Sequence, residues 1–80
     1  MSQLPRDMLK QFREMQGYSL RQFADVLNDQ LPPGMGTYFM ALHNWETGQA
    51  PIPFYMWFYL SHKATGELQA FAKRLVKEMV

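Results

Sequence analysis

The side chains of this chain that could carry out catalysis or bind a metal are few and widely spaced. Cysteine is absent, and the two histidines, His43 and His62, have no partner at a metal-ligand spacing. We therefore expect neither a disulfide nor a metal site. The chain has no glycine-rich phosphate loop, no nucleophile beside a base and no isolated carboxylate pair in an apolar run. This pattern predicts that the protein is not an enzyme and uses no cofactor.

Polar residues at the predicted ends of helices follow a more informative pattern. Gly17 is expected to end one helix, and Ser19 is expected to begin the next as its N-cap. Gln22 follows Ser19 by three residues, which predicts a capping box. In that motif the Ser19 hydroxyl accepts from the backbone amide three residues on, and the Gln22 side chain reaches back. Gly48 can adopt the left-handed conformation that ends a later helix.

Apolar residues recur along the chain at spacings of three and four and do not alternate with period two. This spacing predicts an all-α fold of five helices without a sheet. The helices are expected over about 5–16, 20–27, 37 or 38 to 47, 53–63 and 67–79. Two prolines and two glycines predict that residues 28–36 form no regular helix, and 49–53 is a short rigid connector.

The length of 80 residues predicts a single domain over 1–80. Its apolar fraction of 48% and charged fraction of 19% indicate a folded chain rather than a disordered one. The N-terminus lacks the basic and apolar regions of a signal peptide. The longest apolar stretch, 50–60, is about half the roughly 20 residues of a membrane helix and contains two prolines. We therefore expect a soluble, cytoplasmic protein that does not enter a membrane.

Residues 13–24 and 42–48 resemble the Cro/repressor-type helix-turn-helix family, also called the Xre family. The resemblance covers about residues 9–60. It implies a five-helix, lambda-repressor-like helix-turn-helix domain whose leading partner is double-stranded DNA. Small stand-alone members of this family are often repressors of phages, plasmids or other mobile elements, or antitoxins.

The resemblance also implies roles for individual residues. It pairs Arg13 with Glu46 in a buried ion pair that would fix two helices relative to each other; the alternative is that both charges are solvated. Ser19 stands at the family's N-cap, where the dipole and free amides of the helix can hold a DNA phosphate, or it caps the helix only. Ala24 matches the small residue at the helix crossing. Leu20 occupies a position where the family often has Gln.

One feature departs from the family. A helix-turn-helix joins its two helices with about 3–4 residues, whereas nine residues, 28–36, separate the two predicted helices. Two arrangements are compatible with this insert. Either the helices keep the family geometry and the insert loops out, or the insert lengthens the second helix and repositions the third.

The third predicted helix would present the base-reading face. With Leu42 turned inward, a spacing of 100° per residue places Thr37, Met40 and Asn44 on the opposite face. Asn can bind adenine, and apolar side chains can contact the thymine methyl group. The predicted DNA-binding residues are Ser19, Arg21, Gln22, Thr37, Tyr38, Met40, Ala41, His43, Asn44 and Gln49. The alternative is an ordinary surface helix or a protein-binding face.

The charge distribution does not favour DNA. The net charge is +1, but residues 28–53 carry only Asp29 and Glu46, for a local charge of −2. No Lys or Arg lies on the predicted reading helix, so guanine recognition by that helix would depend on His43 alone. Phosphate neutralisation supplies much of the affinity of DNA-binding proteins. The near-neutral charge therefore favours the protein-binding alternative.

The segment 54–60 is apolar on every side and has five aromatic residues among seven. A single helix cannot bury every side of such a segment in a chain this small. We therefore expect residues 54–80 to contribute to a homodimer; the alternative is a core with scattered exposed aromatics. The predicted interface residues are Tyr55, Trp57, Phe58, Tyr59, Phe71 and Leu75.

These observations predict a sequence-specific, double-stranded DNA-binding transcriptional regulator of the repressor type that acts as a dimer. The family resemblance places it in the bacterial cytoplasm, or in the genome of a phage, plasmid or other mobile element. The alternative function is a protein-interaction module, adaptor or antitoxin-like, on the same scaffold.

Overall fold

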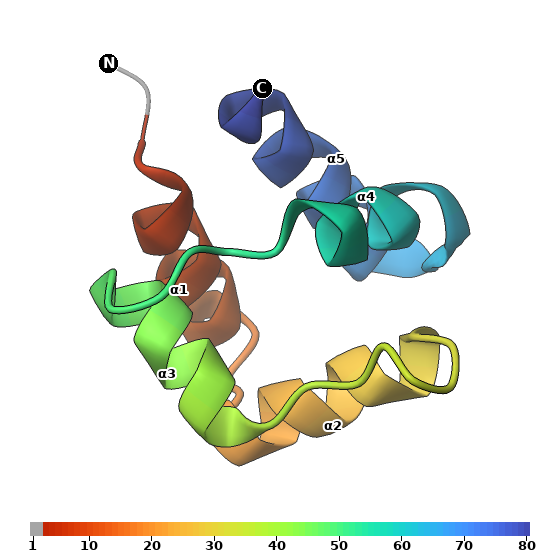
Figure 1. Cartoon of the computed structure of the whole chain (residues 1–80), viewed down its shortest axis with the longest axis horizontal. Coiled ribbons are helices and arrows are strands. Elements are labelled where there is room, and N and C mark those ends of the chain that lie inside the picture. Colours follow the sequence, from red (N-terminus) through yellow and green to blue (C-terminus); the bar gives the residue numbers. More distant parts are fainter. Residues whose placement is uncertain (1–2) are drawn as a thin grey trace.

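Helices account for all regular secondary structure in the part of the chain described here. The computed structural model describes residues 3–80 and places α1 at Pro5–Met15, α2 at Leu20–Gln30, α3 at Phe39–Thr47, α4 at Phe54–Lys63 and α5 at Gly66–Met79. Figure 1 shows these helices and the connections between them. The predicted fold class, five helices and no strand, is confirmed for these residues as a compact all-α globule.

Glycines in the left-handed conformation end α1 and α3, as expected. After α1, the amide of Gly17 (φ 77°) donates to the carbonyl of Glu14, and the amide of Tyr18 donates to the carbonyl of Arg13. After α3, Gln49, which follows Gly48 (φ 82°), donates its amide to the carbonyl of Asn44. Each glycine therefore lets the chain turn back and pair the last carbonyls of its helix.

The second helix is longer than predicted. Residues 28–30 continue α2, so the expected end near residue 27 is wrong by one turn. The helix stops at Leu31, whose backbone is extended (φ −98°, ψ 149°). Pro32 explains this position, because a proline disfavours the helical conformation of the residue before it. The prolines therefore exclude a helix only from Leu31 onward. The third helix, α3, begins at Phe39 rather than at 37 or 38.

Aromatic rings form the centre of the core. The ring of Phe71, on α5, stacks on Phe12 of α1 at 4.2 Å between centroids and meets the edge of Trp57 of α4 at 5.7 Å. Phe12 also contacts Phe23 of α2 at 5.9 Å. Around these rings α4 packs on α5, α2 on α3, and α1 on both α3 and α5. All five helices therefore contribute side chains to one hydrophobic core.

Three of the six residues predicted at a dimer interface belong to this core instead. Trp57, Phe71 and Leu75 have at most 1% of their surface exposed, so they offer no surface to another chain. The reason is that α5 covers the side of α4 that carries Trp57. The remaining aromatic residues of α4 stay accessible: Tyr55 is 79% exposed, Phe58 is 44% exposed and Tyr59 is half-buried.

Among residues 3–80, none of the helices combines the length and the apolar character that crossing a membrane requires.

Candidate nucleic-acid interface

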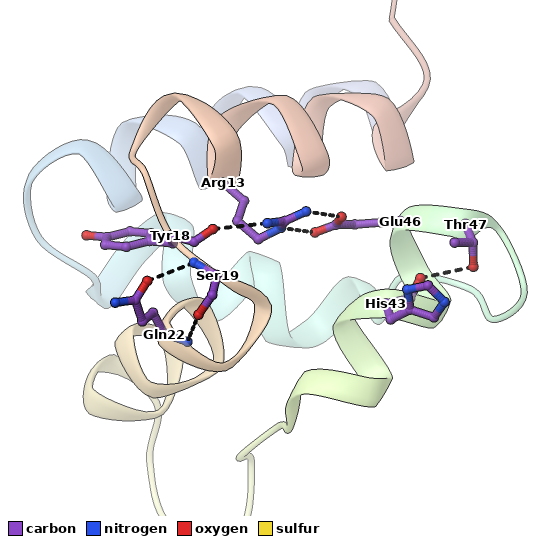
Figure 2. Close-up of polar contacts among 7 residues, drawn as sticks. All are labelled: Arg13, Tyr18, Ser19, Gln22, His43, Glu46 and Thr47. Atoms are coloured by element: carbon purple, nitrogen blue, oxygen red, sulfur yellow. Dashed lines mark hydrogen bonds and ion pairs between the residues drawn. The ribbon is translucent and has the colours of Figure 1, made fainter.

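Arg13, in the last turn of α1, connects three parts of the chain through one guanidinium group. Its Nε donates to Oε2 of Glu46 at 2.7 Å, and its Nη2 donates to Oε1 of the same carboxylate at 3.0 Å. Its Nη1 donates to the backbone carbonyl of Tyr18 at 3.0 Å, just before α2 begins. Figure 2 shows the Arg13 side chain between these two acceptors. The end of α1 is thereby fixed to the end of α3 and to the start of α2.

This ion pair is shielded from solvent. The Arg13 side chain is 14% exposed and the Glu46 side chain is 5% exposed. The hydrogen bond to Glu46 raises the pKa of Arg13 above its ordinary value and outweighs the opposing effect of burial. The guanidinium is therefore charged throughout the neutral pH range. The predicted buried pairing is confirmed, and the alternative of two solvated charges is excluded.

The capping box at the start of α2 is also confirmed. The hydroxyl of Ser19 accepts from the backbone amide of Gln22 at 3.1 Å, and the amide of Ser19 donates to Oε1 of Gln22 at 2.8 Å. Figure 2 shows the reciprocal bonds. Because Tyr18 precedes Ser19 directly and binds Arg13 through its carbonyl, the first turn of α2 is held on both sides. The exposed face of this turn carries Arg21.

The outward face of α3 holds most of the predicted base-reading residues. Tyr38 is 62% exposed, Met40 is 44% exposed and His43 is also exposed. Asn44 is half-buried, and Ala41 packs partly against the core. Leu42 points into the core, as predicted, and Trp45 points into it from the same helix.

The end of α3 is rigid. The hydroxyl of Thr47 donates to the carbonyl of His43 at 2.9 Å, as Figure 2 shows. The carbonyl of Asn44 accepts from the amides of Gln49 and Ala50 at 2.9 and 3.2 Å. Gln49 therefore lies exposed just beyond the helix, with its backbone anchored to α3.

Thr37 occupies a different position from the one predicted. It precedes α3 and does not lie on the face of the helix, because Asn28 of α2 binds its backbone at two points. The side-chain amide of Asn28 donates to the Thr37 carbonyl at 2.9 Å, and its carbonyl oxygen accepts from the Thr37 amide at 2.8 Å. The Thr37 hydroxyl oxygen is buried and has no partner within residues 3–80.

The same two bonds decide the course of the connector between α2 and α3. Residues 31–38 leave the end of α2 and run back along it to the start of α3 (Figure 1). Gly36 lies close to Asn28, where a Cβ would come within 3.2 Å of the side-chain oxygen. Residues 28–30 of the insert therefore lengthen α2, and the rest of the insert is a loop pinned to that helix.

Cations that α3 itself lacks come from neighbouring helices. Arg21 of α2 places its guanidinium over the ring of Phe39, the first residue of α3, at 4.0 Å from the ring centroid. At the other end of α3, a Cβ on Gly48 would clash with the guanidinium of Arg6 from α1. No local sequence pattern points to either contact, because Arg21 and Phe39 are 18 residues apart. Arg6 and Gly48 are 42 residues apart.

A hollow of about 320 Å³ lies between α2 and the start of α3. The residues that line it are Arg21, Ala24, Asp25, Asn28, Thr37, Tyr38 and Phe39. In residues 3–80, no three side chains of His, Cys, Asp or Glu gather where they could hold a metal ion.

Comparison with models of protein families, with curated proteins and with solved structures found no match to this chain.

Proposed function

We propose that this chain is a sequence-specific, double-stranded DNA-binding transcriptional regulator of the repressor type. The observation that carries the proposal is the set of hydrogen bonds from Arg13, which connects the end of α3 to the turn before α2. Two helices held in this way present a single surface to a duplex. An arrangement that a buried ion pair stabilises also resists distortion when one helix is pressed into a groove.

In the proposed mode α3 lies in the major groove and contacts bases through Tyr38, Met40, His43 and Asn44. The major groove is about 12 Å wide and admits an α-helix, whose diameter with side chains is about 10–12 Å. Arg21, in the first turn of α2, lies beside the start of α3. Ser19 caps that turn. The fold would then be a lambda-repressor-like helix-turn-helix with a long connector in place of the short turn.

The proposal includes a symmetric homodimer. An aromatic cluster on α4 consists of Phe54, Tyr55 and Phe58. The ring centroid of Phe54 lies 5.7 Å from that of Tyr55 and 5.7 Å from that of Phe58. Tyr55 and Phe58 are exposed, so a second copy could cover them. A two-fold axis would place two copies of α3 in half-sites about one helical turn apart.

Binding of the purified protein to duplex DNA tests the proposed function. We expect fluorescence anisotropy to detect a preferred duplex among fragments tiled across the DNA that flanks the protein's own gene. Affinity should fall between about 50 and 200 mM salt, because phosphate contacts release counterions. The absence of binding to any duplex at low salt would reject the proposal.

A protein-interaction module is the second candidate. The exposed aromatic pair on α4 and the lack of Lys and Arg on α3 favour it. In that case the surface of α3 or α4 would bind a protein, as in an adaptor or an antitoxin. A chain that binds no duplex but forms a stable complex with one protein from its own cells would support this alternative.

A further inference from the structure

Arg21 belongs to α2 but extends to the start of α3, where the ring of Phe39 supports it. The guanidinium carbon lies 4.0 Å from the ring centroid. An aromatic ring contacts the flat face of a guanidinium and leaves the N–H groups at its edge available. Within residues 3–80, these N–H groups of Arg21 take part in no hydrogen bond or ion pair. The side chain is therefore oriented while its donors remain unused.

The surroundings of Arg21 favour an uncharged ligand over a phosphate. Arg21 and Phe39 line the hollow between α2 and α3 together with Asp25. A phosphate placed against Arg21 in this hollow would also meet the negative charge of Asp25, which would oppose its binding. A base edge carries no charge and meets no such repulsion.

We infer that Arg21 recognises a guanine in the major groove and that Phe39 is the residue that positions it. Two parallel N–H groups at the edge of a guanidinium match the O6 and N7 acceptors of guanine. The N-terminal part of a recognition helix contacts bases, and the guanidinium of Arg21 reaches this part of α3 from α2. Since α3 has no Lys or Arg, the guanidinium comes from α2. This inference rests on the proposed function.

Selection from a pool of randomised duplexes tests the role of Arg21. The full chain should select a site that contains a guanine, and Arg21→Ala should lose its preference at that one position. Affinity for the selected site should fall about 5- to 150-fold, with little loss on duplexes that lack this guanine. Replacing this guanine by 7-deazaguanine, which lacks the N7 acceptor, should weaken the unmodified protein but not Arg21→Ala. Lys73→Ala, which removes an exposed cation from α5, is the matched control.

Variants at Phe39 test the positioning role. Phe39→Leu keeps an apolar side chain but removes the ring, and it should weaken the guanine preference at the same position. Phe39→Tyr keeps the ring and should retain the preference. Thermal melting of both variants verifies that they fold. A Phe39→Leu variant that folds and keeps the full preference would overturn this part.

The outcomes separate the inference from the proposed function. If the unmodified protein selects no duplex, the proposed function itself fails. If it selects a site but Arg21→Ala loses affinity equally on every duplex, Arg21 contacts phosphate and the inference is wrong. An Arg21→Ala variant with unchanged affinity and preference would also overturn it.

Discussion

At the scale of single residues, Arg13 uses one guanidinium to connect α1, α3 and the turn before α2. Its three donors reach a carboxylate and a backbone carbonyl that lie 33 and 5 positions away in the sequence. The side chains of Arg13 and Glu46 are only 14% and 5% exposed, so water would compensate either charge only in part if its partner were removed. A buried charge without a partner is costly, and this cost makes the pair a structural requirement.

We predict that Arg13→Ala and Glu46→Ala each lower the free energy of unfolding by about 3–5 kcal/mol. Such a loss is comparable to the whole stability of a domain of this size. Because the raised pKa keeps Arg13 charged below the alkaline range, the loss should be the same across neutral pH. Thermal melting by circular dichroism measures it, with the exposed Lys10→Ala on α1 as control. Single variants that melt like the control would contradict the prediction.

Asn44 is the residue of α3 whose side chain is best suited to read adenine. If α3 reads DNA, Asn44→Ala should weaken the free energy of binding to a specific site by about 1–3 kcal/mol. Binding to random duplex should change little. Anisotropy titrations with both kinds of duplex measure the difference. Glu78→Ala, an exposed change on α5, should alter neither. Equal losses on both duplexes would mean that Asn44 positions the protein without reading a base.

At the scale of elements, the connector between α2 and α3 behaves as a pinned loop. Asn28 binds the backbone of Thr37 at two points, and Gly36 leaves room for the Asn28 side chain. The loop therefore returns along α2 and delivers the chain to the start of α3. A long loop is tolerated thermodynamically because its closure entropy grows slowly with length. Fixing its end is what decides where α3 begins.

We predict that Asn28→Ala loosens the start of α3 and lowers the free energy of unfolding by about 1–3 kcal/mol. Two hydrogen bonds are lost, each contributing about 0.5–1.5 kcal/mol. Hydrogen exchange should accelerate at the backbone amide of Thr37, which loses its acceptor. The neighbouring Asp29→Ala serves as control, because the exposed Asp29 side chain makes no hydrogen bond or ion pair within residues 3–80. Unchanged exchange at Thr37 would show that the loop holds its course without Asn28.

At the scale of the whole molecule, the core divides the aromatic residues of α4 into two groups. Trp57 faces α5 and is buried, whereas Tyr55 and Phe58 remain exposed on the surface. Burying apolar surface contributes roughly 25 cal/mol per Å². An exposed aromatic pair therefore offers a driving force for association that the core leaves unused.

We predict that the protein is dimeric at micromolar concentration through this exposed part of α4. Replacing Tyr55 and Phe58 together by Ser should give a monomer in sedimentation equilibrium, with a mass close to the 9.4 kDa of one unmodified chain. Met15→Ser removes a methionine on α1 that is 78% exposed and should leave the dimer intact. If the unmodified protein remains monomeric at high concentration, the predicted dimer is wrong.

The sequence by itself determined the features that depend on neighbours along the chain. The five helices follow from apolar residues at helical spacing, and the capping box of Ser19 and Gln22 joins residues three positions apart. The left-handed turns at Gly17 and Gly48 are equally local. The pairing of Arg13 with Glu46 was anticipated as well, although only the family resemblance connected two such distant positions.

Tertiary structure alone decided the contacts between residues that no local pattern connects. The position of Arg21 over Phe39 depends on how α2 packs on α3. The covering of α4 by α5 removed Trp57 from the predicted interface. The physical reason is that hydrogen bonds within a turn depend on the backbone of a few residues. By contrast, side-chain burial and long-range contacts depend on the relative placement of whole helices, which only the shared core determines.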